Sequence, residues 1–113
     1  MKRDLEILRA ILMDEEDTGT GKLGQWTDEQ VLYHRSLLIE AGYLKGTTYH
    51  TGDTITLHSY GLSWKGHEFL DATRAPAIWQ IVRNRLREHG STVAIEIALA
   101  LAKQAAAKIL NLP

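Results

Sequence analysis

The sequence predicts a small, mainly helical domain that carries one two-stranded β-hairpin and a C-terminal apolar helix. Apolar residues recur at helical spacing over most of the 113-residue chain. A Thr-Gly-Asp-Thr turn breaks this pattern between two short segments rich in Thr, Tyr, Leu and Ile, which favour strands. Residues that cap or stop helices divide the rest, and they are Thr27, Gly42, Ser63 and Pro76.

The first helix is expected over about residues 2–14. Leu5, Leu8 and Leu12 recur at i, i+3 and i+7, and two isoleucines widen this apolar stripe. The acidic run at 14–17 crowds the negative end of the helix dipole, and Thr-Gly-Thr-Gly follows it. We therefore expect the helix to end at the acidic run and a loop to continue to about residue 24.

The second helix is expected to begin after Thr27 and to reach Ala41. Thr27 and Gln30 have the spacing of a capping box, and Gly42 suits a left-handed stop. Strand-forming residues at 43–49 and 54–58 then predict a hairpin over about residues 43–58.

The C-terminal part of the chain is expected to form three helices. Ser63 caps the first of them, and Pro76 suits the first turn of the next. Gly90 ends that helix and Ser91 caps the last, over about residues 92–110. The last helix is apolar on most of its circumference, which predicts burial on more than one side and therefore a homodimer. The candidate dimer-interface residues are Val93, Ile95, Ile97, Leu99 and Leu101.

This order of elements, a helix, a hairpin and a second capped helix, is typical of a winged-helix unit. We expect a single domain over residues 1–113, with a winged-helix-like core at 1–73 and a helical extension at 75–110 that serves as the dimerisation element. Little room remains before Thr27 for the second helix of a helix-turn-helix, so the helical core is expected to be abbreviated.

Composition limits the function classes. The net charge is −1 and the pI is about 6.5, so a cationic face for nucleic acid must arise from local clustering. Cysteine is absent, which excludes disulfides and thiolate metal sites. Charged residues interrupt the N-terminal apolar stretch and the last helix, so neither a secretory leader nor a membrane span is predicted. We expect a cytoplasmic protein.

No motif for catalysis is present. His34, on an apolar helix face, is expected to donate to a backbone carbonyl in the core, whereas His50 and His58 flank the hairpin turn and could meet across the strands. The histidines lack the tight spacing of a zinc module, and no nucleophile triad or phosphate-binding glycine loop is indicated. We expect no enzyme, no catalytic residue, no metal and no cofactor. The three tryptophans are expected to be core anchors, and they are Trp26, Trp64 and Trp79.

The second helix is a poor candidate for reading DNA. Base reading needs outward Arg, Lys, Asn or Gln, whereas its predicted exposed strip holds Glu29, Ser36 and Glu40, with Tyr33 at its edge. The candidate nucleic-acid contacts are Gln30 and Arg35 on this helix, Lys45 and Lys65 near the hairpin, and Arg83 and Arg87, which share a later helix face. We favour the interpretation that these cations are solvated surface charges, and the alternative is that the hairpin lies along the minor groove or the phosphate backbone.

Four segments resemble a known family of short, uncharacterised bacterial and prophage-encoded proteins that is grouped as a domain of unknown function. They are MKRDLEILR at 1–9, YHRSLLIEAGYLKG at 33–46, LSWKGHEFLDATR at 62–74, and the IW at 78–79 that precedes a basic helix. The resemblance implies a winged-helix-like fold and an association with mobile elements, and it transfers no catalytic residues. We expect a non-enzymatic regulatory or accessory protein of phage or prophage type, for which double-stranded DNA is a candidate partner. The alternative is a protein-interaction module on the same scaffold that does not bind DNA.

Overall fold

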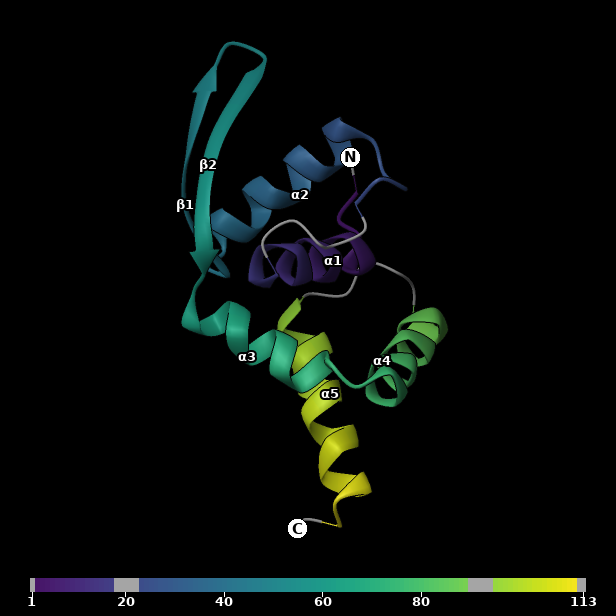
Figure 1. Cartoon of the computed structure of the whole chain (residues 1–113). Helices are drawn as coiled ribbons and strands as arrows, with labels where there is room; N and C mark the ends of the chain where they lie inside the picture. The colour runs from purple at the N-terminus through teal and green to yellow at the C-terminus, as the bar shows by residue number, and fades with distance from the viewer. Residues whose placement is uncertain (1, 18–22, 90–94, 112–113) are drawn as a thin grey trace. The chain divides into compact units, whose positions relative to one another are not determined.

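The computed structural model describes residues 2–17, 23–89 and 95–111. Along these ranges the elements are α1 (Leu5–Glu16), α2 (Asp28–Glu40), β1 (Leu44–Thr51), β2 (Thr54–Leu62), α3 (Trp64–Thr73), α4 (Pro76–His89) and α5 (Ile95–Ile109) (Figure 1). The predicted fold class, mainly helical with one small hairpin and a C-terminal helix, is confirmed. Three predictions lie outside the described residues: the helix stop at Gly90, the helix cap at Ser91 and the interface residue Val93.

The chain divides into two compact units, Arg3–His67 and Glu68–Pro113, which we describe separately. The boundary falls inside α3, ahead of the predicted division after residue 73. The number of domains and the winged-helix comparison stay predictions.

Capping residues set the helix ends in the first unit. Asp4 accepts a hydrogen bond from the Glu6 amide at 2.8 Å, so α1 begins three residues later than predicted. Thr27 and Gln30 form the predicted capping box, with bonds of 3.1 Å and 2.9 Å to each other's backbone amides. Gly42 has φ of 84°, as its predicted role as a left-handed stop requires.

His34 is a core histidine, as predicted. It is 1% exposed, and its Nδ1 lies 2.7 Å from the Gln30 carbonyl oxygen. Its Nε2 accepts a hydrogen bond from the Asp4 amide at 3.0 Å, so the proton of the neutral ring is on Nδ1, which donates to Gln30. This ring ties α2 to the N-terminus of α1. The buried apolar side chains of this unit are Leu5, Ile7, Leu8, Ile11, Leu12, Leu38, Tyr43, Leu44 and Leu62.

The two strands pair antiparallel, and the hairpin extends beyond α1 and α2 (Figure 1). Leu44 pairs with Leu62 but Gly46 pairs with Ser59, so β2 contains one residue more than β1 in this interval and forms a β-bulge. Gly61, within the bulge, has φ of 131°. At Gly46 a Cβ atom would lie 2.5 Å from the His58 carbonyl oxygen, so this position requires glycine.

The second unit buries apolar side chains of α3, α4 and α5. The rings of Phe69 and Trp79 meet edge to face with centroids 6.3 Å apart, and Trp79 is 3% exposed, which confirms it as a core anchor. The described part of α5 buries one alanine stripe, Ala98, Ala102 and Ala105. Within one chain this stripe packs toward the core of the unit and Ile97 is 53% exposed, so burial on more than one side and the homodimer stay predictions.

Candidate nucleic-acid interface

α2 presents no base-reading face. Its three exposed side chains are Asp28, Glu29 and Glu40, all carboxylates that repel phosphates. Ser36, predicted on the exposed strip, is only 9% exposed because its hydroxyl turns back to donate to the Tyr33 carbonyl. Gln30, a candidate contact, uses its side chain in the capping box.

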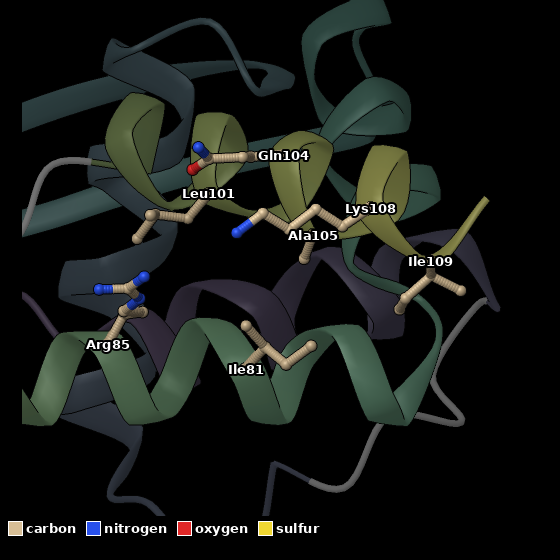
Figure 2. A pocket seen from close by; sticks show the side chains of 7 residues that line it. All are labelled: Ile81, Arg85, Leu101, Gln104, Ala105, Lys108 and Ile109. Atoms are coloured by element: carbon tan, nitrogen blue, oxygen red, sulfur yellow. The ribbon is translucent and has the colours of Figure 1, made fainter. Parts of the chain in front are cut away.

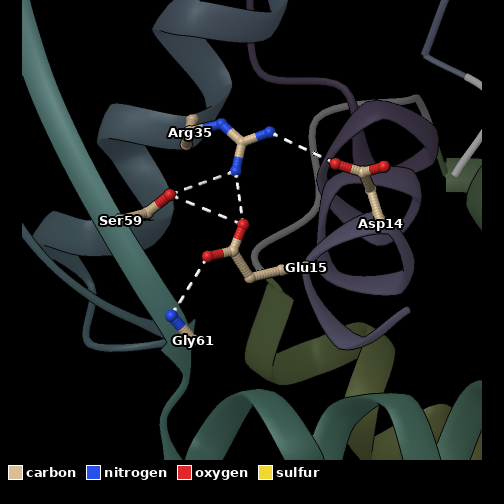
Figure 3. Close-up of polar contacts among 5 residues, drawn as sticks. All are labelled: Asp14, Glu15, Arg35, Ser59 and Gly61. Atoms are coloured by element: carbon tan, nitrogen blue, oxygen red, sulfur yellow. Dashed lines mark hydrogen bonds and ion pairs between the residues drawn. The ribbon is translucent and has the colours of Figure 1, made fainter. Parts of the chain in front are cut away.

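Arg35 is held by carboxylates of α1 (Figure 3). Its Nη1 donates to Glu15 Oε2 at 2.7 Å, and its Nη2 lies 3.7 Å from Asp14 Oδ2. Nη1 also lies 3.3 Å from Ser59 Oγ on β2. The Arg35 side chain is 16% exposed, and its N–H donors bond to groups of the protein itself. They are therefore not available to a base edge.

Glu15 is the centre of this network. Besides Arg35, it accepts a hydrogen bond from the Gly61 amide at 3.1 Å, and its side chain is 13% exposed (Figure 3). The amide is freed from strand pairing by the bulge. Glu15 thus joins α1, α2 and β2 in one polar cluster. Sequence reasoning treated residues 14–17 as a crowded helix end, and no local pattern links them to Arg35 twenty residues later.

The outer face of the hairpin carries Lys45. Strand alternation places Tyr49, His58 and Tyr60 on the same face, and the two tyrosines are 61% and 63% exposed. The rings of His58 and Tyr60 lie 6.1 Å apart. His50 pairs with Ile55 and His58 with Thr47, so the two histidines do not meet across the strands and that prediction is wrong.

The start of α3 differs from the prediction at one tryptophan. Trp64 is 83% exposed and is therefore not a core anchor, because it is the first residue of α3 and points away from the buried side. Trp26 is half-buried. Lys65, a candidate nucleic-acid contact, is exposed, and its Nζ lies 5.3 Å from the centroid of the Tyr43 ring.

α4 brings the two remaining candidates together. Arg83 and Arg87 lie at i and i+4, and Gln80 and Asn84 share that face at i−3 and i+1 from Arg83. Gln80 donates to Asn84 at 2.9 Å and accepts from Arg83 Nη1 at 3.1 Å. We call these four residues the α4 polar stripe. Sequence reasoning missed Gln80 and Asn84, although the same spacing rule that paired the two arginines would have found them.

Charge is distributed unequally between the units. Residues 68–113 contain six Lys or Arg and four Asp or Glu, whereas residues 3–67 contain six and ten. The unit that holds the α4 polar stripe is therefore net positive, and the unit that holds α2 is strongly negative. The near-neutral total hides this difference.

A small cavity of about 120 Å³ lies between α4 and α5 (Figure 2). Ile81, Leu101, Ala105 and Ile109 form its apolar wall, and Arg85 stands at its rim. Gln104 and Lys108 complete the lining.

Among the described residues, no group of three or more His, Cys, Asp or Glu side chains is arranged to hold a metal ion. No described helix is long and apolar enough to cross a membrane.

Comparison with known proteins identifies the family. The profile of the family described as "Hypothetical protein (DUF2513)" matches residues 2–92, so the chain belongs to this family. An uncharacterized protein of Haemophilus influenzae is 27% identical over 118 aligned positions, which cover 98% of this chain and 97% of the relative. No solved structure matches the chain significantly. The predicted membership in a family of unknown function is confirmed.

Proposed function

We propose that this DUF2513 protein is a non-enzymatic regulatory or accessory protein that binds duplex DNA with the α4 polar stripe. The observation that carries the proposal is the composition of that stripe: Gln80, Arg83, Asn84 and Arg87 occupy one helix face. Gln and Asn recognise adenine in the major groove, and Arg recognises guanine or binds phosphate. The same criterion excludes α2 as the helix that reads DNA, because its exposed side chains are carboxylates.

The dimensions of α4 fit this role. Its 14 residues extend about 21 Å, and a helix of this length can lie in a major groove about 12 Å wide. Gln80, Asn84 and Arg87 are exposed, and Arg83 is half-buried. Hydrogen bonds among Arg83, Gln80 and Asn84 hold these side chains along the helix surface. Binding exchanges those bonds for bonds to DNA. The two amides of the stripe then supply discrimination between sequences, and its two arginines supply the affinity.

Fluorescence anisotropy of a labelled random duplex tests the proposal. We expect binding at low salt that collapses by about 200 mM, as phosphate-dominated binding does. Arg83→Ala/Arg87→Ala should weaken binding on every duplex and lower the salt slope by about 2, one for each phosphate that no longer meets an arginine. Arg74→Ala/Arg85→Ala is the matched control, because it removes two exposed cations from the same unit outside the stripe.

Two results would refute the proposal. One is the absence of binding at low salt with micromolar protein. The other is an equal loss of affinity in the Arg83/Arg87 variant and the control, which would show a response to net charge alone. Gln80→Ala/Asn84→Ala should keep binding to random DNA and lose preference for any site selected by the wild-type protein.

The second candidate is a protein-interaction module, and the hairpin favours it. Tyr49, Tyr60 and Trp64 are 61%, 63% and 83% exposed, and exposed aromatic side chains of this kind dominate protein interfaces. Parallel affinity purifications with the wild-type chain and with Tyr49→Ser/Tyr60→Ser test it. A partner that is retained only by the wild type supports this candidate, and identical partner sets count against it.

The cellular setting belongs to the proposal as well. A DNA-binding accessory protein acts in the cytoplasm, and the family resemblance suggests a phage or prophage origin. Genes of mobile elements beside the coding sequence would support that origin, and conserved housekeeping neighbours across genomes would oppose it.

A further inference from the structure

The outward face of α5 is uncovered within the described chain and has no role in the proposed function. Ile97 on this face is 53% exposed. Ile97, Ala100, Gln104 and Ala107 follow one another at intervals of three and four residues, the spacing of a coiled-coil seam. We call these four residues the α5 seam.

The charges beside the α5 seam are segregated along the helix. Glu96 and Lys103 both flank the seam on one side, seven residues apart, and they have opposite signs. Leu101 and Lys108 flank the other side. This arrangement distinguishes between possible orientations of a second helix.

We propose that a second copy of this chain docks on the α5 seam with its own α5 antiparallel. In that pairing Ile97 packs on Ala107 of the second copy and Ala100 on Gln104, and each layer occurs twice by symmetry. Glu96 then lies beside Lys103 of the second copy, so two opposite-charge pairs form. A parallel pairing would instead set Lys103 against Lys108 of the other chain, which is repulsive. The charge pattern therefore selects an antiparallel copy.

The surroundings of the seam fit this occupant. Lys103 already lies 3.3 Å from Glu68 of its own chain, and its three N–H donors allow a second carboxylate. The α4–α5 cavity shares Leu101, Gln104 and Lys108 with the edge of the seam, so the docked helix covers the cavity rim (Figure 2). A pair of 15-residue helices is smaller than the standard interface of about 1,600 Å², so we expect a dimer that dissociates at about micromolar concentrations.

Sedimentation velocity over about 1–200 µM protein, without DNA, tests the proposal and does not depend on the proposed function. We expect monomer to convert to dimer within this range. Glu96→Lys and Lys103→Glu should each raise the dimer Kd about tenfold, because each replaces two attractive pairs by repulsive ones. The double variant Glu96→Lys/Lys103→Glu restores opposite charges and should return the Kd to near the wild-type value.

Control variants distinguish the α5 seam from the remaining surface of the protein. Glu88→Lys makes the same charge change on an exposed residue of α4 and should leave the Kd unchanged. Glu96→Gln removes the pair without placing a cation in the first turn of α5, and it should also weaken the dimer. Ala107→Cys reports orientation in this cysteine-free chain, because a parallel dimer would form the disulfide readily and an antiparallel one would not.

Three results would overturn the proposal. A monomer at every concentration excludes a second copy as the occupant. A dimer whose Kd changes with neither Glu96→Lys nor Lys103→Glu uses another surface. A ready disulfide at position 107 shows a parallel arrangement.

Discussion

Replacing Arg35 by methionine tests whether this residue stabilises the fold or contacts a nucleic acid. Arg35→Met keeps most of the aliphatic length and removes the guanidinium. Glu15 then loses its hydrogen bond at 2.7 Å, and Asp14 loses its contact with the guanidinium at 3.7 Å. The Glu15 carboxylate stays in a place where it is only 13% exposed, without the guanidinium that neutralised it. The remaining hydrogen bond to Glu15 from the Gly61 amide, at 3.1 Å, does not neutralise its charge.

The expected loss of stability follows from these interactions. Removing one partner of a buried ion pair costs about 3–5 kcal/mol. Water reaches this pair to a small extent, with exposures of 16% and 13%, so we expect about 2–3 kcal/mol. For a chain of this length, each kcal/mol lowers Tm by about 4 °C, which predicts a decrease of about 8–12 °C.

Thermal and urea unfolding followed by circular dichroism measures this loss. Arg74→Met is the matched control, because it removes the same group from a pair with Asp71 that is 50% and 73% exposed, and it should cost less than about 1 kcal/mol. Equal effects of the two substitutions would falsify the structural role of Arg35. Below its own transition, Arg35→Met should bind DNA as the wild type does. A specific loss of DNA affinity in the folded variant would restore Arg35 as a contact.

Three further predictions concern the core and the hairpin, each checked by urea unfolding. Trp79→Ala should cost about 3–5 kcal/mol because the ring is 3% exposed, whereas Trp64→Ala should cost less than about 0.5 kcal/mol because that ring is 83% exposed; similar losses would contradict the assigned positions. Gly46→Ala should cost about 2 kcal/mol or more, since the new Cβ would lie 2.5 Å from the His58 carbonyl oxygen, and an unchanged midpoint would show that the strands can separate there. His34→Ala should cost about 2–4 kcal/mol, because it leaves a cavity and removes both hydrogen bonds of a ring that is 1% exposed; a loss below about 1 kcal/mol would indicate that water replaces the ring.

The features that the sequence predicted correctly depend on neighbouring residues. Thr27 and Gln30 satisfy each other's amides three residues apart, and Gly42 provides a conformation that other residues adopt at a cost. Ser63 caps α3 as predicted, with its hydroxyl accepting from the Gly66 amide at 3.2 Å. Such local rules need no knowledge of the tertiary structure.

The features that were missed depend on distant partners. α1 continues through Glu16 because Arg35 neutralises the carboxylates that were expected to end it. Trp64 is exposed although its residue type favours burial, since one position at a helix start decides where the ring points. The α4 polar stripe was half predicted from its two arginines. Gln80 and Asn84 complete it at the same helical spacing, so this omission is the exception that did not depend on a distant partner.

The β-bulge at Gly61 has a consequence for the accuracy of folding. The hairpin is rich in threonine on both strands, and such similar residues specify strand register weakly. Only when β1 and β2 pair as observed does the unpaired Gly61 amide face Glu15 at 3.1 Å. A slipped hairpin would move another residue into that place and leave the carboxylate without this donor. The Glu15 carboxylate on α1 therefore stabilises the observed strand register over a slipped one, because only the observed register supplies this hydrogen bond.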